Sequence, residues 1–545
     1  MREGLPWSAV REHSWTSPED LHAEGTAARA AAPIAALAAL PARVASGGDG
    51  DRAVEIVASS NGERVADLVP IRIGRMTSSP FAFLRGSAAV MAADLDGAPD
   101  SGLHGWICGD AHAANFGLYA SPERRQVMDV NDFDETVIGP WHWDLLRLVS
   151  SLVAAGREAG IGDDRCRTVA TDCAAAYRQA TAELAVMPLL EAYYLTTDHS
   201  TLVRHDIGHL TETFDRVAKK ARKNTHRRAV TKFAQALAHD TMRFVEDPPV
   251  LTRPAAEETA SVVESLDEFA ASLDDEIRTL FTRYAVRDVG HRIVGLGSVG
   301  YRSYVVLLEG NHDDSLVLQV KQVRPSALLP HLPEAARRAT FAHHGERVVR
   351  GQRWMQTVSD VLLGWTTIEG RHFLVRQFRD MKGSIDPTTL KSNQLDDYAR
   401  VVGVVLARAH AQSLDPRILH GYCTTTDDGA ADAEAAGAEF DDALAGFAVA
   451  YADRTAADHE ALLAAVRAGR LPAEGPVLVE GHRVRGGPGR EPVISVSGEH
   501  GVGVVVAADD PETLGEVQPA GRVGPLDAQA DPGDPPLLRG GEQGA

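Results

Sequence analysis

The chain has few cysteines and a strongly negative net charge, and each of these two properties excludes a class of protein. The 545 residues include only four cysteines, and none has a metal-binding spacing such as Cys-x2-Cys: Cys108, Cys166, Cys173 and Cys423. We therefore expect free thiols in a reducing compartment. The formal charge of −21 repels nucleic-acid phosphates and anionic lipids over most of the surface, so we expect no nucleic-acid partner and no membrane partner.

The sequence also lacks a recognisable targeting signal and a long apolar run. Residues 1–5 do not have the basic-then-apolar pattern of a signal peptide. The alanine-rich stretch 27–40 contains Arg29 and Pro33 and is too short to span a bilayer. These features predict a cytoplasmic protein, and they leave the oligomeric state open.

The length and a hydrophobic content of 44% suit a globular protein of two or three domains with a sizeable core. Periodicity and composition divide the chain into five parts. We expect a poorly ordered lead-in with one helix near 33–45 (1–60), a helical lobe with the catalytic and metal loops (61–290), a small sheet lobe (291–390), helices that complete the large lobe (391–470) and a disordered tail (471–545).

A pair of polar motifs in the first third of the chain has the chemistry of phosphoryl transfer. This reaction needs a carboxylate to accept the proton of the substrate hydroxyl, and oxygen ligands for Mg²⁺. Asp110 fits the catalytic base, and Asn115, five residues later, offers an amide oxygen to the metal. Asp132 fits a charged metal ligand, but Asp129 and Asp134 flank it, so the choice among the three stays open with Asp132 favoured. The alternative is that Asp110 and Asn115 are ordinary turn residues.

A second pair of motifs, much later in the chain, has the features of a nucleotide-phosphate site. Glycines and a serine lie between two strand-like runs, which favours a kinase-type flap over a dinucleotide fold: Gly295, Gly297, Ser298 and Gly300. An ordinary hairpin turn without a ligand is the alternative. Lys321 ends the alternating strand that follows and would point a cation at the phosphates. We expect Glu346, on a helix at 334–356, to pair with Lys321, and residues 375–378 to meet the adenine.

Some basic residues have no assigned role. The run 219–223 suits a solvated helix face or the steering of an anionic substrate. Arg75 and Arg85 suit either contacts to phosphate or pairing with nearby acids. His410, on an apolar helical face, is expected to be packed.

The motifs resemble those of known phosphotransferases. Gly109-Asp110-x4-Asn115, then Asn131-Asp132-aromatic-acid, then Gly139-Pro140-x3-Asp144-Leu is similar to the aminoglycoside and choline kinase branch of the protein-kinase-like superfamily. Residues 70–470 as a whole resemble an uncharacterised bacterial domain-of-unknown-function family (number twenty-two fifty-two), through segments that include 79–86, 108–117, 131–135, 295–300, 351–353 and 407–411.

This resemblance implies a fold and a set of roles. Asp110 would be the catalytic base, Asn115 and Asp132 the metal ligands, and Asp144 the aspartate that holds the catalytic loop. Cys108 departs from the pattern, since most relatives have histidine there. The glycine loop and its lysine come first in kinases but second here. We therefore expect an α+β, protein-kinase-like two-lobed fold that is circularly permuted, with a mostly helical large lobe and a small antiparallel sheet lobe.

The predicted activity is kinase-like, with ATP and Mg²⁺ as cofactors and a hydroxyl of a small molecule or protein as the acceptor. Nucleotidyl transfer (AMPylation) is the main catalytic alternative. An ATP-binding pseudoenzyme or sensor is less consistent with an intact Asp110, Asn115 and Asp132. A metal-dependent hydrolase using Asp129, Asp132, Asp134 and His112 would leave Lys321 and the glycine loop unexplained.

Overall fold

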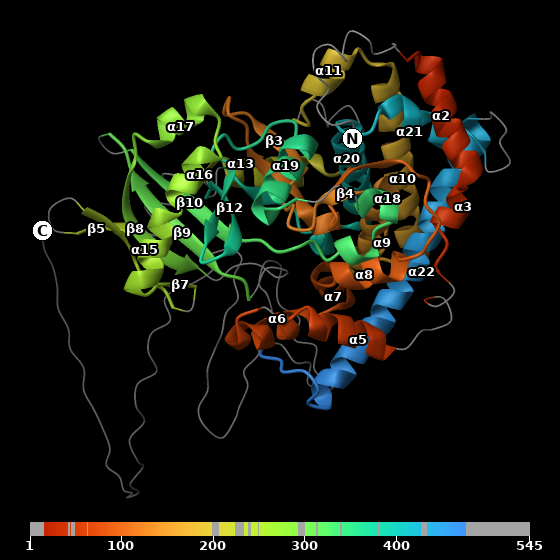
Figure 1. Ribbon diagram of the computed structural model, residues 1–545. Helices are drawn as coiled ribbons and strands as arrows, with labels where there is room; N and C mark the ends of the chain where they lie inside the picture. Colours follow the sequence, from red (N-terminus) through yellow and green to blue (C-terminus); the bar gives the residue numbers. More distant parts are fainter. Residues whose placement is uncertain are drawn as a thin grey trace, which may run out of the picture. The chain divides into compact units, whose positions relative to one another are not determined.

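The computed structural model describes residues 16–41, 44, 50–62, 64–198, 207–223, 234–237, 241–248, 250–292, 300–311, 314–337, 341–378, 381–426 and 433–475. Within them the chain is mixed α and β, with small antiparallel sheets (Figure 1). None of the described helices combines the length and apolar composition needed to cross a bilayer.

The helices of the first half of the chain are α2 (Pro18–Ala31), α3 (Ile34–Leu37), α5 (Gly50–Ser59), α6 (Val69–Met76), α7 (Pro80–Gly86), α8 (Ala88–Leu95), α9 (Trp141–Glu158), α10 (Asp163–Val186), α11 (Leu189–Tyr194), α13 (Thr211–Lys223) and α15 (Ala256–Glu264). Those of the second half are α16 (Leu266–Ala271), α17 (Asp275–Phe281), α18 (Glu334–Arg337), α19 (His344–Met355), α20 (Ser392–Ala411), α21 (Pro416–Cys423) and α22 (Ala433–Arg467). Short 3₁₀ turns lie at Ala66–Leu68, Ala113–Asn115, Leu329–His331 and Pro387–Thr389.

The largest sheet has six strands in the order β11-β12-β10-β9-β8-β7, and every neighbouring pair is antiparallel. Their bounds are β7 (Leu251–Thr252), β8 (Ala285–Arg292), β9 (Ser303–Glu309), β10 (Ser315–Gln322), β11 (Gly364–Ile368) and β12 (Arg371–Gln377). The register places Lys321 of β10 between Ser303 and Leu374. Lys321 is thus on an inner strand, where its backbone is fixed on both sides.

Smaller sheets flank the Asp110 loop, which we define as residues 108–115. Strand β1 (His104–Ile107) pairs with β4 (Val137–Pro140), and β2 (Phe116–Ala120) lies between β3 (Gln126–Val130) and β13 (Gly383–Ser384). A separate hairpin joins β5 (Ala234–Leu237) and β6 (Thr241–Phe244). The loop therefore leaves one small sheet and enters another, so its two ends are anchored independently.

Helix α9 is the central element of the helical core. Pro140 precedes its first turn, and almost all of its side chains are buried. It packs against α10, α20 and α22, and its leucine-rich faces belong to one continuous apolar cluster with those helices. The sheet has its own apolar cluster, built around Val306, Leu318 and Phe373.

Elements from the two ends of the sequence pack together. Gly25 of α2 approaches α21 so closely that a Cβ atom there would lie 1.9 Å from the Ile418 carbonyl oxygen. Helix α22 contacts α3 and α5, and its Tyr451 hydroxyl donates to Asp94 Oδ2 at 2.9 Å (Figure 1). The helical core is thus completed by residues more than 350 positions apart.

Several predictions about elements need correction. The lead-in to about residue 60 contains α2, α3 and α5, because Ser17 caps α2 with its side chain and the buried face of α2 packs on α21. The predicted helical lobe at 61–290 also contains strands, among them β1 to β7. Strands β1 and β3, on either side of the Asp110 loop, pair with β4 and β2. The helix predicted at 334–356 is divided into α18 and α19.

Other predictions about elements agree with the structure. The segment 391–470, expected to be helical, contains α20, α21 and α22. The predicted tail lies outside the described residues after Gly475.

Candidate functional site

A buried carboxylate at the start of α9, that of Asp144, holds the Asp110 loop through hydrogen bonds to its backbone. Asp144 accepts from Cys108 N at 2.6 Å and from Gly109 N at 2.8 Å. His410 of α20 contacts the same carboxylate, with Nε2 3.3 Å from Asp144 Oδ2, and its other ring nitrogen lies 2.9 Å from the Tyr177 hydroxyl. The loop-holding role that the resemblance implied for Asp144 is therefore seen directly, and His410 is packed as expected.

Gly109 is required by the shape of this loop. Its φ of +78° is a conformation that side chains disfavour. A Cβ atom there would lie 2.3 Å from the carbonyl oxygen of Glu135. The glycine thus lets the Asp110 loop approach the carboxylate loop, which we define as residues 131–136.

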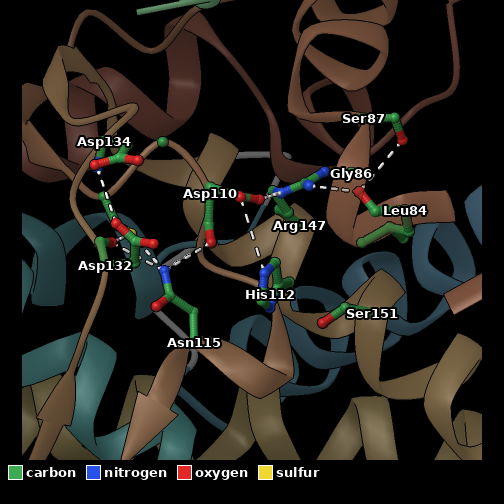
Figure 2. Close-up of polar contacts among 12 residues, drawn as sticks. Leu84, Gly86, Ser87, Asp110, His112, Asn115, Asp132, Asp134, Arg147 and Ser151 are labelled. Atoms are coloured by element: carbon green, nitrogen blue, oxygen red, sulfur yellow. Dashed lines mark hydrogen bonds and ion pairs between the residues drawn. The ribbon is translucent and has the colours of Figure 1, made fainter. Parts of the chain in front are cut away.

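Asp110 faces a buried arginine. Arg147 Nε lies 2.5 Å from Asp110 Oδ1, while Arg147 Nη2 donates to the Leu84 carbonyl at 2.8 Å (Figure 2). Burial raises the pKa of Asp110 to about 6, although the Arg147 charge opposes this rise. The carboxylate is therefore ionised at neutral pH, with its affinity for a proton increased.

Asn115 connects the two loops through its amide group. Its Nδ2 donates to the Asp132 carbonyl at 2.9 Å and to the Asp110 carbonyl at 3.1 Å (Figure 2). Because the nitrogen is used in this way, Oδ1 is the atom that Asn115 can offer to a metal. A simple turn residue would not need to contact both loops.

Lys321 meets the carboxylate loop from a position 187 residues later in the chain. Its Nζ lies 2.5 Å from Asp134 Oδ2 and 3.7 Å from Asp132 Oδ2. The side chain of Lys321 is 6% exposed, whereas that of Asp132 is 52% exposed. Lys321 therefore contacts both carboxylates of this loop.

The charges around Lys321 determine how the two carboxyl groups ionise. Burial and the neighbouring Asp132 charge raise the pKa of Asp134. Burial also acts to raise the pKa of Asp132, but Lys321, Arg376 and Lys382 outweigh it and lower that pKa. Asp132 is therefore the carboxylate that stays charged and open to solvent.

The described residues contain no ready-made cluster of three His, Cys, Asp or Glu side chains that could hold a metal. Mg²⁺, however, is commonly bound through one or two carboxylates together with substrate phosphates and waters. Asp132 and the free oxygen of Asn115 fit such a site. The residues present therefore suit an ion that arrives with a nucleotide.

Glu346 does not pair with Lys321. It lies in the first turn of α19, where its carboxylate contacts Arg350 at 2.7 Å, and Lys321 is already occupied by Asp134. The predicted helix is interrupted between α18 and α19, and Glu346, in the first turn of α19, is paired with Arg350 of the same helix. The residue of α19 that does reach the site is Arg347, whose guanidinium donates to the carbonyls of Asp134 and Thr136.

The glycine segment falls largely outside the described residues, including Gly295, Gly297 and Ser298. Gly300 is described: its φ is +97°, and its carbonyl accepts from Val65 N at 2.8 Å. The end of the predicted flap is thus attached to the segment that precedes α6.

Asp129 lies away from the candidate metal site. Arg408 Nη1 lies 2.8 Å from Asp129 Oδ2, and both side chains are 1% exposed. The two oxygens also accept from the backbone of Val130 and Thr357. The choice left open by the sequence therefore narrows to Asp132 and Asp134, because Asp129 is committed to a buried ion pair.

Asp129→Ala is expected to lower the free energy of unfolding by about 3–5 kcal/mol, because it leaves the Arg408 charge buried without its partner. Urea denaturation measures this loss. Asp442→Ala is the control, since Asp442 pairs with Arg167 at the surface, and it should cost less than about 1 kcal/mol. A loss for Asp129→Ala no larger than that for Asp442→Ala would contradict a structural role.

Arginines are the site residues that sequence reasoning missed. Arg147, Arg347 and Arg408 are each about 1–3% exposed, on helices whose apolar faces surround them. The sequence signal that could have identified these arginines is a charged residue at a position that helical periodicity assigns to the core.

Comparison with known proteins gives one match. Residues 64–465 match the family described as "Uncharacterized protein conserved in bacteria (DUF2252)". No curated protein and no solved structure matches the chain significantly.

Proposed function

The chain belongs to this family of bacterial proteins, and from its site we propose that it is an ATP- and Mg²⁺-dependent phosphotransferase acting on a hydroxyl group. One observation carries the proposal. Lys321, a buried cation on an inner strand, lies against the carboxylate loop that Asn115 ties to the Asp110 loop. A cation, a metal ligand pair and a base within one cluster are the parts that phosphoryl transfer needs.

The proposed roles follow from these contacts. Asp110 accepts the proton of the acceptor hydroxyl, since it is the carboxylate with the raised proton affinity. Asp132 and Asn115 Oδ1 hold Mg²⁺, and Lys321 pairs with the nucleotide phosphates. Mg²⁺ supplies positive charge that stabilises the transferring phosphoryl group. The segment 295–300 is proposed as the flap and 375–378 as the contact to adenine.

The proposed fold is protein-kinase-like, two-lobed and circularly permuted. Its support is the order of the parts: the Asp110 loop precedes the sheet that carries Lys321, yet both contribute to one cluster. Helices α20 and α22, which follow the sheet, pack against α9 and so return to the core that holds the Asp110 loop.

A hydrolase built on Asp129, Asp132, Asp134 and His112 is disfavoured by the ion pair between Asp129 and Arg408. Nucleotidyl transfer would use the same residues with ATP bound in the opposite direction. Incubation with Mg²⁺ and ATP labelled at the α or the γ phosphorus decides between the two: transfer of γ label supports the proposal, and transfer of α label contradicts it.

Mg-ATP is expected to stabilise the parent protein by about 2.7 kcal/mol at a concentration of about 100 Kd. Lys321→Ala should lose most of this stabilisation, because the phosphates lose their cation. Thermal unfolding with and without Mg-ATP measures it, and Arg287→Ala, which removes a sheet arginine paired with Glu309, is the control. Equal stabilisation of the parent and Lys321→Ala would contradict the assigned role.

Turnover should rise with pH through about 6. A carboxyl with a raised pKa is protonated below that value, and a protonated Asp110 cannot accept a proton. We expect kcat/KM for ADP release to fall about tenfold for each pH unit below about 6. A profile that stays flat from pH 5 to 8 would argue against Asp110 as the base.

A further inference from the structure

A second arginine lies near the ion pair of Arg147 and Asp110. Arg147 contacts Asp110 and also donates to the Leu84 carbonyl on α7. The next residue of α7 is a second arginine, Arg85. Figure 2 shows Arg147 reaching from Asp110 to this helix end.

Arg85 lacks an acidic partner among the described residues. Its side chain is half-buried, its Nε is shielded from solvent without a hydrogen bond, and its guanidinium lies 5.8 Å from the centre of the Phe81 ring. Glu158 is close enough to feel the Arg85 charge, but it is hydrogen-bonded to Ser79. The Arg85 guanidinium is thus within range of the Glu158 charge without a close ion pair among the described residues.

His112 contacts Asp110 and is close enough to feel the Arg85 charge. Its side chain is 10% exposed, Nε2 is 3.9 Å from Asp110 Oδ2, and Nδ1 is buried with no hydrogen bond to a described residue. Burial, followed by the charges of Arg85 and Arg147, lowers the pKa of His112 well below its ordinary value. An imidazole offers an N–H donor in either protonation state.

We propose that Arg85 and His112 form the subsite for an anionic group of the acceptor, so that the acceptor is a hydroxyl compound bearing a carboxylate or phosphate group. This inference rests on the proposed function, since it assigns the substrate class of the same site. A guanidinium pairs well with either group. Arg85 would repel a cationic group placed against it.

The test uses the full chain at saturating Mg²⁺ and the non-hydrolysable analogue AMP-PNP, followed by thermal unfolding. Three small probes share a three-carbon hydroxylated skeleton and differ in the group at one end: glycerate carries a carboxylate, glycerol 3-phosphate carries a phosphate, and glycerol is neutral. We expect saturable stabilisation by one or both anions and none by glycerol at the same concentrations. The stronger anion identifies the preferred group.

Arg85→Gln should weaken the apparent anion affinity about tenfold or more, and Arg85→Lys should weaken it less because the charge remains. Arg417→Gln is the matched control, since Arg417 is also partly buried but is paired with Asp415 and lies on α21. Melting curves without probe show whether each variant is folded.

Each outcome decides the proposal. Equal anion affinity in the parent and Arg85→Gln, or stabilisation of the parent by glycerol but not by the anions, would overturn it, as would no response to any probe. If AMP-PNP fails to stabilise the protein while the anions still bind through Arg85, the phosphotransferase assignment fails and the anion subsite stands.

Discussion

Asp110→Asn is expected to lower kcat for Mg-ATP turnover by about 10²–10⁴-fold while leaving nucleotide affinity nearly unchanged. An asparagine keeps the size of the side chain but cannot accept the proton of the attacking hydroxyl. The loop itself should persist, because Asp144 holds it through the backbone of Cys108 and Gly109.

The measurement is ADP release under saturating Mg-ATP, together with thermal stabilisation by Mg-ATP. Asp163→Asn is the matched control, since this aspartate is 72% exposed at the start of α10 and pairs with Arg157. Full turnover in Asp110→Asn would reject its role as a base. Loss of nucleotide binding would instead indicate that Asp110 supports the site structurally.

Asp132→Asn is expected to weaken Mg²⁺ binding in the nucleotide complex by about 100-fold, because it removes the charged ligand from a site that has few others. The measurement is the Mg²⁺ concentration that gives half-maximal ADP release. Lys321→Met is expected to have the opposite effect, an increase in metal affinity. In the absence of nucleotide it should increase affinity for Mn²⁺, since Lys321 then no longer competes for Asp132 and Asp134.

Electron paramagnetic resonance of free Mn²⁺ measures the second effect. A Lys321→Met protein that binds Mn²⁺ no better than the parent would indicate that the lysine and the metal occupy different places. If Asp132→Asn leaves the Mg²⁺ dependence unchanged, Asp134 and not Asp132 is the carboxylate that binds the metal.

Local spacing made part of this site predictable. The interval between Asp110 and Asn115 fixes a tight loop, so their proximity follows from sequence alone. Lys321 was predictable because an alternating strand ends there after a glycine-rich segment. The family resemblance supplied Asp144.

The remaining residues depend on long-range packing that local spacing does not encode. Asp129 and Asp134 both lie within three positions of Asp132, but the partner of Asp129, Arg408, lies 279 residues away. Glu346 was assigned as an acid of the predicted helix near 351–353, but its partner is Arg350 of its own helix. The early helices were missed because alanine-rich sequence has weak periodicity, even though Ser17 followed by Pro18, Glu19 and Asp20 is a helix-start signal.

The dependence of the Asp110 loop on α20 has a consequence for synthesis of the protein. Asp144 is made soon after the loop, but His410, which contacts it, follows the loop by roughly 300 residues, or about 15–60 s of translation at about 5–20 residues per second. During that time the emerging chain contains Asp110 and Asp144 but not His410, which contacts Asp144 in the folded protein. We expect an N-terminal fragment ending before α20 to expose the apolar faces of α9 and α10, and so to require chaperones until the last helices arrive.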